Sequence, residues 1–170
     1  MGTNLEIGSG ENPQPGYVHC DKYVSNGKSH LLDFICDACS VPLADGSCSN
    51  ILMFGVFEHF GIFEVEPIMA EVLRLLEPGG VFKFDVPDFD WFVERYLFPD
   101  RRPENRDEDW ILKAIFGGQD GEGQFHKWGW NYKRMMNFLQ SEKWNFSEIK
   151  MVGRQWRNEE FNHLIWECKK

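Results

Sequence analysis

The chain has 170 residues, 42% of them hydrophobic, and this size and composition are typical of one folded domain, here residues 1–170, and not of a disordered chain. Asp and Glu number 27 against 18 Lys and Arg, and the resulting net charge of -9 opposes binding to nucleic acids and anionic membranes. The longest apolar run, Ile51 to Phe57, is far shorter than the roughly 18 residues of a membrane-spanning helix. The absence of a signal peptide at the start and an odd number of cysteines, five, predict a cytoplasmic protein with reduced thiols.

Short apolar runs alternate with loops and amphipathic stretches, which favours an α/β fold with a mainly parallel sheet and crossover helices. The clearest helix ends before Pro78, because apolar residues recur every three or four positions up to that point. In chain order, the predicted elements are strands over Leu5–Ile7, Tyr17–Cys20, Leu32–Cys36 and Ile51–Phe54, a helix over Glu64–Glu77, a strand over Val81–Val86, a helix over Asn131–Glu142 capped by Asn131, and strands over Phe146–Val152 and Phe161–Cys168.

Three stretches interrupt this alternation. Only ten residues separate Gly10 from Asp21, too few for a full crossover helix, so the first connections are predicted to be abbreviated. Residues 99–109 are almost wholly charged, which predicts a solvated loop. Residues 117–130 are rich in glycine and then in aromatic side chains, which indicates a mobile segment that ends in an aromatic wall. We therefore interpret residues 88–130 as an insertion that forms a lid over a binding cleft.

A glycine-rich turn follows the first predicted strand. Gly8 and Gly10 allow the backbone to approach a ligand closely, as in the first turn of nucleotide-binding folds. Pro13 stands where the dinucleotide pattern G-x-G-x-x-G has its third glycine, so an ordinary tight turn is an open alternative.

Two aspartates follow the second and third predicted strands. Asp21 and Asp37 would lie at the carboxyl ends of these strands, where open α/β sheets bind ligands. Carboxylates at this edge can accept hydrogen bonds from ribose hydroxyls or from an adenine amino group. For each aspartate taken alone, a turn-forming role is the alternative.

An ordered series of motifs extends through most of the chain apart from the charged loop. It opens with L-x-I-G-S-G-x-x-P-x-x-G-Y-x-x-x-D over Leu5–Asp21. It continues through Val41–Ser47, Val56–Phe60, Leu76–Val81, Val86–Phe89, Phe116–Gln119 and Phe125–Lys127. In this series the sequence resembles the class I S-adenosylmethionine-dependent methyltransferases, specifically the small methyltransferases of the type 11-like family.

The resemblance implies a Rossmann-like, mostly parallel sheet of seven strands in the order 3-2-1-4-5-7-6, with the last strand antiparallel. The polar loop expected over Gly153–Glu160 fits a terminal hairpin. The resemblance also implies S-adenosylmethionine as cofactor, with its methionine end on the glycine turn, its ribose near Asp21 and its sulfonium at the end of strand four. The cofactor-binding residues that it implies are Glu6, Gly8, Ser9, Gly10, Asp21, Asp37, Ala38, Phe54 and Gly55.

The sequence departs from its relatives after strand four. They commonly carry H-x-x-E-H, whereas Gly55 takes the place of the first histidine here. Removal of a proton from an acceptor needs a group that titrates near neutral pH, so His126 in the predicted lid and His59 are the candidate catalytic residues. A hydrogen bond to lid backbone is the alternative role for His126, and a structural or capping role is favoured for Glu58.

The aromatic residues and cysteines allow two further readings. Trp91, Phe92, Trp128 and Trp130 are candidates for an apolar acceptor pocket or for cation–π contacts with the sulfonium, with core packing as the alternative. The pair Cys36 and Cys39 has no second pair at metal-ligand spacing, so no metal site is predicted.

The leading functional hypothesis is methyl transfer to an oxygen or nitrogen of a small-molecule or sugar-containing acceptor, with no nucleic-acid and no membrane partner. The alternative is a non-catalytic protein that binds S-adenosylmethionine or S-adenosylhomocysteine as a sensor or partner subunit. Gly55 and the short segment Met1–Asn4 before the first strand motivate this alternative, since the lid must then come from residues 88–130. A nicotinamide-dependent oxidoreductase is disfavoured by Pro13. The sequence leaves the oligomeric state open.

Overall fold

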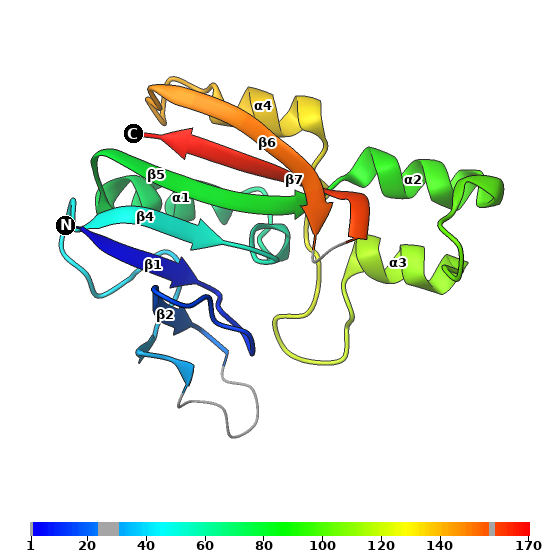
Figure 1. Ribbon diagram of the computed structural model, residues 1–170, viewed down its shortest axis with the longest axis horizontal. Coiled ribbons are helices and arrows are strands. Elements are labelled where there is room, and N and C mark those ends of the chain that lie inside the picture. The colour runs from blue at the N-terminus through cyan, green and yellow to red at the C-terminus, as the bar shows by residue number, and fades with distance from the viewer. Residues whose placement is uncertain (1, 24–30, 157–158) are drawn as a thin grey trace.

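A seven-stranded sheet forms the centre of the computed structural model, which describes residues 2–23, 31–156 and 159–170 (Figure 1). The strand order is β3-β2-β1-β4-β5-β7-β6. Neighbouring strands from β3 to β5 are parallel, and β7 is antiparallel to both β5 and β6. The predicted α/β class, strand order and antiparallel last strand are therefore confirmed. The elements are β1 (Thr3–Ile7), β2 (Val18–Asp21), β3 (Phe34–Ile35), β4 (Cys48–Met53), a 3-10 turn (Phe57–His59), α1 (Val65–Leu75), β5 (Leu76–Pro87), α2 (Phe89–Leu97), a 3-10 turn (Pro99–Arg101), α3 (Glu108–Phe116), α4 (Tyr132–Leu139), β6 (Glu148–Trp156) and β7 (Glu159–Lys169).

The first connection is abbreviated, as predicted. Residues 8–17 link β1 to β2 through turns and contain no helix. The backbone N–H groups of Gly8 and Ser9 both donate to the carbonyl of Cys20, which fixes the turn after β1 against the end of β2. The glycine turn and the acidic end of β2 are thereby brought together.

The predicted boundary between α1 and β5 is wrong by several residues. The helix ends at Leu75, and the strand begins at once with Leu76, which pairs with Cys48 of β4. Pro78 and the two glycines after it do not form a separate loop. They lie inside β5, where the register to β4 shifts between Cys48 and Asn50, so the strand accommodates the proline as an irregularity at the start of its ladder.

The charged loop predicted over residues 99–109 is shorter than expected. It holds a 3-10 turn, and α3 begins within it at Glu108. Asp107 caps α3 by accepting a hydrogen bond from the N–H of Trp110 at 2.9 Å, and Asp88 caps α2 in the same way through Trp91. In Figure 1, α2 and α3 lie side by side beyond one end of the sheet.

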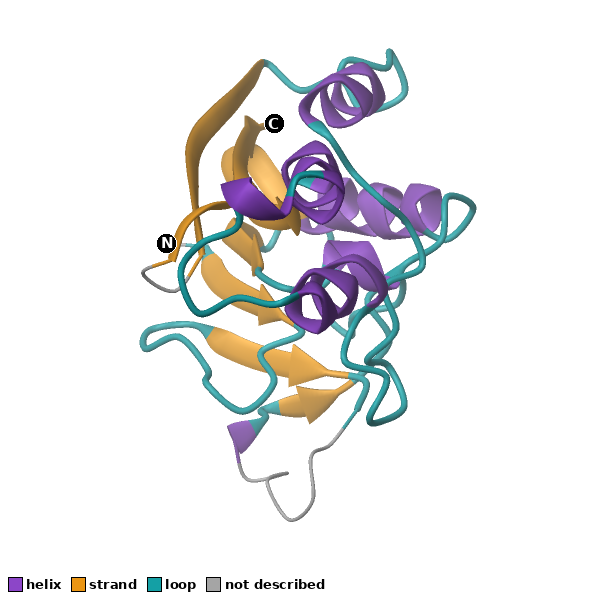
Figure 2. Cartoon of the chain, turned by 90° about the vertical axis from the view of Figure 1, so that its right-hand side faces the viewer, coloured by secondary structure: helices purple, strands orange, loops and turns teal. Residues whose placement is uncertain are grey.

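The core lies between the sheet and the helices that cover one of its faces. Figure 2 shows the helices on one side of the strands. Leu5 and Ile7 of β1 are buried on this side with Val72 of α1 and Met135 of α4. The alternate residues point to the other face and are more polar: the amide of Asn50 donates to the side chain of Asn4 at 2.8 Å.

The last two strands are longer than predicted. β6 continues to Trp156 and β7 begins at Glu159, so most of the predicted loop over Gly153–Glu160 is strand, and its residues 157–158 lie outside the described residues. None of the helices in the described part of the chain is long and apolar enough to cross a membrane.

Candidate active site

A cleft of about 630 Å³ lies at the carboxyl ends of β1, β2 and β4. The strand order reverses at β1, which lies between β2 and β4, and open α/β sheets bind ligands at such a point. The volume falls within the usual range of cofactor and small-molecule sites. The residues that line the cleft are Ile7, Gly8, Gly10, Asp21, Lys22, Tyr23, Cys36, Asp37, Ala38, Cys39, Gly55, Val56, His59, Phe60, Phe63, Glu64, Pro67, Ile68, Glu122, Gly123, Gln124, Phe125 and Lys127.

Three glycines shape the floor of the cleft, and each has a positive φ angle: Gly8 at 75°, Gly10 at 56° and Gly55 at 65°. A Cβ at Gly8 would overlap the side chain of Val56, so this glycine is needed for close packing. A Cβ at Gly10 or Gly55 would meet no atom within 4 Å. Both glycines line the cleft, so their bare backbone keeps its space open for a ligand.

Asp21 ties the end of β2 to the glycine turn. Its carboxylate accepts hydrogen bonds from the N–H groups of Gly10 at 3.0 Å and Tyr23 at 2.9 Å. Each carboxylate oxygen has a further lone pair, so ribose hydroxyls can still donate to it. Asp21 is therefore placed to organise the turn and to bind a ligand at once.

Asp37 and Lys22 form an ion pair at the edge of the cleft. The Nζ of Lys22 lies 2.8 Å from Oδ2 of Asp37, while Oδ1 accepts from the N–H of Cys39 at 3.2 Å. The hydrogen bond from Lys22 lowers the pKa of Asp37 to about 2, so this carboxylate is ionised at neutral pH. The adjacent Ala38 is buried and adds an apolar side chain to the lining of the cleft.

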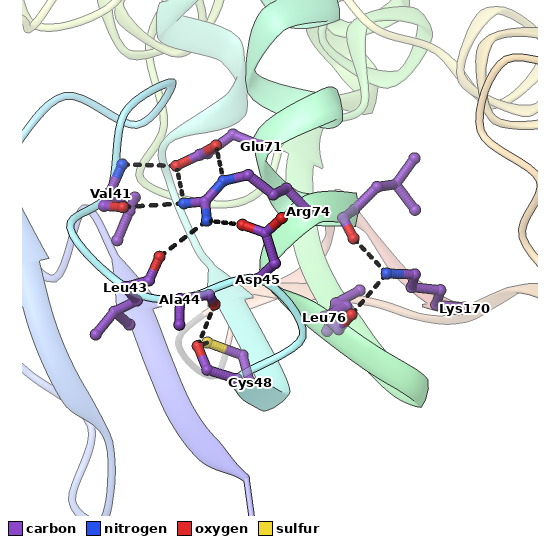
Figure 3. A network of polar contacts seen from close by, with 11 residues as sticks. Val41, Leu43, Ala44, Asp45, Cys48, Glu71, Arg74, Leu76 and Lys170 are labelled. Carbon is purple, nitrogen blue, oxygen red and sulfur yellow. Dashed lines mark hydrogen bonds and ion pairs between the residues drawn. The ribbon is translucent and has the colours of Figure 1, made fainter.

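A charged network holds the loop that carries Ala38 against α1 (Figure 3). The guanidinium of Arg74 donates to the carbonyls of Val41 and Leu43 at 3.0 and 2.9 Å and to the carboxylates of Glu71 and Asp45. Glu71 also accepts from the N–H of Val41 at 2.7 Å. Residues 41–45, which follow Ala38, are thereby fixed to α1.

Three residues of the predicted cofactor set do not line the cleft. The carboxylate of Glu6 accepts from the N–H of Gln14 at 2.7 Å and lies 3.0 Å from the ring Nδ1 of His19, so it braces the loop after β1. Ser9 is buried beside the turn, and Phe54 follows the last residue of β4. By contrast, the structure brings Gly8, Gly10, Asp21, Asp37, Ala38 and Gly55 to the same cleft.

The two predicted catalytic histidines lie together, but only His59 lines the cleft. Their ring centroids are 4.8 Å apart, edge to face. The Nδ1 atom of His59 donates to the carbonyl of Phe125 at 3.1 Å, and Nδ1 of His126 donates to that of Ala114 at 3.0 Å. Since a carbonyl can only accept, each neutral ring carries its proton on Nδ1 and keeps a lone pair on Nε2.

Burial controls the protonation of this pair. It lowers the pKa of His59, and the hydrogen bond to the carbonyl of Phe125 partly opposes the shift. Burial and the neighbouring charge of His59 lower the pKa of His126 to about 4. Both rings are therefore neutral at pH 7, the state in which an imidazole accepts a proton or binds a cation.

Glu58 lies behind the histidines and is only 3% exposed. One carboxylate oxygen, Oε1, is 3.9 Å from Nε2 of His126, and the other, Oε2, has no hydrogen-bond partner among the described residues. Burial raises the pKa of Glu58 well above 4.5, and the nearby Asp85 adds to this shift. The sequence analysis favoured a structural or capping role for Glu58. That role does not explain why the buried Oε2 has no hydrogen-bond partner among the described residues.

Part of the predicted lid segment closes one side of the cleft. Residues 122–125 and Lys127 line it, and Lys127 pairs with Glu64 across the opening at 3.0 Å. Gly123 lies against the ring of Tyr23, because a Cβ there would come within 2.6 Å of it. The contact between Gly123 and Tyr23 connects the loop after α3 with the loop after β2. No local sequence pattern predicts this connection.

The predicted aromatic pocket is not found in this cleft. Phe92 and Trp130 are both 1% exposed and belong to the packed interior, while the guanidinium of Arg95 stacks over Trp91 and that of Arg134 over Trp128. The aromatic residues that line the cleft are Tyr23, Phe60, Phe63 and Phe125. The first three lie shortly after the ends of β2 and β4, a position from which the sequence could have identified them.

The fold, with its sheet order, is that of solved S-adenosylmethionine-dependent methyltransferases. Residues 9–84 match the family model for a methyltransferase domain. These findings confirm the resemblance seen in the sequence: part of the chain matches a methyltransferase domain, and the whole chain has the fold of solved S-adenosylmethionine-dependent methyltransferases.

Solved structures share the whole fold at low sequence identity. A S-adenosylmethionine-dependent methyltransferase from Thermotoga maritima, described as a possible histamine N-methyltransferase, has a TM-score of 0.64 and 16% identity, covering 100% of this chain and 83% of that one. A S-adenosylmethionine-dependent methyltransferase from Methanosarcina mazei has a TM-score of 0.63 and 16% identity, with coverage of 99% and 92%.

A curated relative matches a shorter stretch. It is the tRNA (carboxymethyluridine(34)-5-O)-methyltransferase ALKBH8 of Macaca fascicularis, which is 42% identical over 48 residues. The match spans 28% of this chain and only 7% of that relative's length.

Proposed function

We propose that the chain transfers the methyl group of S-adenosylmethionine to an oxygen or nitrogen of a small-molecule or sugar-containing acceptor. The observation that supports this most is the cleft, in which Gly10 and Gly55 leave open backbone and Asp21 and Asp37 present carboxylates at the reversal point of the sheet. When bound, the cofactor supplies an electrophilic methyl group on a sulfonium.

The residues of the cleft fit the parts of this cofactor. Asp21 accepts hydrogen bonds from the ribose, and Ala38 packs against the adenine beside Asp37. Gly8 and Gly10 would hold the methionine end, and Gly55 would border the sulfonium. Glu6 and Ser9 do not line the cleft and would support the cofactor site indirectly. Glu6 does so by holding Gln14 and His19 in place.

The acceptor lies on the side of the cleft formed by His59 and the predicted lid, residues 88–130. Methyl transfer is an in-line displacement, so the protein has to align the acceptor atom and lower its affinity for its proton. His59 reaches the cleft and His126 lies directly behind it, and both are neutral at pH 7. We assign these two histidines to acceptor activation.

The charge of the chain supports a small acceptor. A net charge of -9 repels the phosphates of a nucleic acid, and Asp21, Asp37, Glu64 and Glu122 add carboxylates to the cleft itself. The name of the relative ALKBH8 points to tRNA instead, so tRNA belongs among the acceptors to be tested. All five cysteines are free thiols, which supports a cytoplasmic location.

The first experiment is a calorimetric titration with S-adenosylmethionine, S-adenosylhomocysteine and NAD. We expect the first two to bind and NAD not to bind. Asp21→Ala should weaken cofactor binding at least tenfold, because it removes the ribose acceptor and the support of Gly10. Asp100→Ala is the matched control, since Asp100 is exposed after α2 and does not line the cleft. Equal affinity of Asp21→Ala and the wild type would refute the ribose assignment.

The acceptor class is then tested with radiolabelled cofactor and a panel of hydroxylated metabolites, sugars, amines and tRNA. Label in a sugar or small metabolite supports the proposal, and label in tRNA alone overturns it. Cofactor binding without product on any acceptor would favour the non-catalytic alternative.

A further inference from the structure

We propose that Glu58, His59 and His126 bind one divalent transition-metal ion at the acceptor side of the cleft. The sequence analysis predicted no metal site, because the pair Cys36 and Cys39 has no second pair at metal-ligand spacing. The proposal deepens the acceptor side of the proposed function, but metal binding itself does not depend on methyl transfer.

The three side chains are already close to the spacing of metal ligands. One ligand atom from each lies within 4.8 Å of the other two, and Nε2 of His126 is 3.9 Å from Oε1 of Glu58. Around a tetrahedral zinc with bonds of about 2.1 Å, ligand atoms lie roughly 3.4 Å apart. The ligand atoms would have to approach one another by up to about 1.4 Å, which is within the reach of side-chain rotation.

The two histidines carry the second shell that metal-binding histidines need. Such a ring usually donates its other N–H to a carbonyl or carboxylate, which fixes the tautomer and the orientation of the ring. Here Nδ1 of His59 faces the carbonyl of Phe125, and Nδ1 of His126 faces the carbonyl of Ala114. Both Nε2 atoms therefore carry lone pairs without any rearrangement.

Glu58 provides an independent observation. Its side chain is more than nine-tenths buried, and its Oε2 lacks a hydrogen-bond partner among the described residues. A buried carboxylate oxygen without a partner loses its hydrogen bonds to water and gains none in the folded protein, which is unfavourable. A cation bound between the three side chains would satisfy this open oxygen.

Backbone hydrogen bonds hold the two ligand-bearing segments together. The N–H of Lys127 donates to the carbonyl of Glu58 at 2.9 Å, and the N–H of His126 donates to that of Phe116 at 3.0 Å. The ligands on the turn after β4 and on the segment after α3 are thus fixed relative to each other, which lowers the entropy cost of forming the site.

The donor set selects the kind of ion. Two imidazoles and one carboxylate suit zinc, iron(II), cobalt and manganese, whereas magnesium and calcium prefer oxygen ligands alone. Three protein ligands leave a position open, as in catalytic sites. His59 lines the cleft, so the open position faces the space where an acceptor oxygen or nitrogen would bind.

The test uses the full chain after treatment with a chelator, titrated separately with zinc chloride, manganese chloride and magnesium chloride by calorimetry. We expect one equivalent of zinc to bind, with magnesium at least a hundredfold weaker. Anomalous diffraction at the zinc edge should place the ion between Glu58, His59 and His126. Zinc that remains unbound at 1 mM, or that lies elsewhere in the crystal, overturns the proposal.

Near-isosteric variants test the ligands. Glu58→Gln and His126→Asn should each weaken zinc at least a hundredfold, more than the roughly 10–100-fold expected for loss of a supporting group. His19→Asn is the control, because His19 pairs with Glu6 outside the cluster, and it should bind zinc as the wild type does. Unchanged zinc affinity in folded Glu58→Gln and His126→Asn refutes the site.

The cofactor titration separates this proposal from the proposed function. Cofactor binding without zinc binding overturns the metal site alone. Zinc binding at the three ligands without cofactor binding overturns the assignment of the cleft alone. Retained cofactor binding in Glu58→Gln also shows that the variant is folded.

Discussion

Arg74 is the residue through which the stability of the cofactor side of the cleft can be tested most directly. Its guanidinium makes five hydrogen bonds, two of them to the carbonyls of Val41 and Leu43 and two to the carboxylate of Glu71. The side chain of Glu71 is 9% exposed and that of Arg74 is 32% exposed, so the pair is only partly screened by solvent. The arm to Asp45 is exposed and contributes little.

We expect Arg74→Ala to lower the free energy of unfolding by about 3 kcal/mol. Removing one partner of a buried pair costs about 3–5 kcal/mol, and the partial exposure of Arg74 places it at the lower end. For a chain of this length the loss corresponds to a fall in Tm of roughly 6–12 °C. Urea denaturation followed by tryptophan fluorescence measures it.

Arg101→Ala is the matched control, because Arg101 forms an exposed ion pair with Glu94. It should cost less than about 1 kcal/mol. A loss below about 1 kcal/mol for Arg74→Ala would refute the reasoning, since water would then replace the lost hydrogen bonds without cost.

The same network predicts a pH dependence with a defined sign. The hydrogen bond from Arg74 lowers the pKa of Glu71 below its ordinary value of 4.5. A carboxyl with a lowered pKa in the folded state stabilises it fully above the unfolded value and loses this contribution as the pH falls. The advantage of the wild type over Arg74→Ala should therefore be constant from pH 5 to 8 and shrink below pH 4.5. An advantage that grows on acidification would contradict this assignment.

Three other changes probe the cleft and the cap of α4. Gly123→Ala should weaken S-adenosylmethionine binding several-fold, because φ at this position is 82° and the new Cβ would meet the ring of Tyr23. Gly121→Ala is the control and should leave binding unchanged, since its Cβ would make only an ordinary contact with Gln124. Cys39 lines the cleft and is exposed, so bound cofactor should slow its reaction with a thiol reagent, and equal rates with and without cofactor would exclude contact. Asn131→Ala should cost about 1 kcal/mol in a denaturant titration, because its side chain accepts from the N–H of Arg134 at 2.8 Å; no loss would mean that the cap is dispensable.

The sequence predicted those parts of the site that lie within a few residues of a strand end. The turn with Gly8 and Gly10, Asp21 after β2 and Asp37 after β3 all lie at the cleft, because parallel strands deliver their carboxyl ends to one edge. The same rule identifies Lys22, which the sequence analysis overlooked although it directly follows Asp21.

Glu6 shows where this reasoning fails. It lies inside β1, where side chains alternate between the two faces, and Leu5 and Ile7 take the face that packs on the helices. The carboxylate of Glu6 therefore lies on the opposite face, where His19 of the neighbouring strand meets it. The alternation of side chains along the strand predicts this face for Glu6. The resemblance to the family motif nevertheless placed Glu6 among the cofactor-binding residues.

The predicted boundaries of β5 and α3 were wrong for a different reason. Pro78 with two glycines, and a run of charged residues, are local signals for a loop. In the structure, pairing with β4 carries the strand through the proline, and the cap formed by Asp107 starts a helix among the charges. Tertiary pairing and a single capping hydrogen bond outweighed the local composition in these two places.

Gly55 links the fold to the chemistry. Its N–H donates to the buried carboxylate of Asp85 at 2.7 Å, and its φ of 65° is one that favours glycine. A histidine here would strain the backbone and extend into the open space of the cleft. The glycine therefore does not simply mark a lost base. It keeps room in the cleft beside the position that we propose for the sulfonium, and His59, four residues later, reaches the same cleft with His126 and Glu58 behind it. We therefore assign the chemistry on this side of the cleft to Glu58, His59 and His126, which the fold brings together from the turn after β4 and the segment after α3.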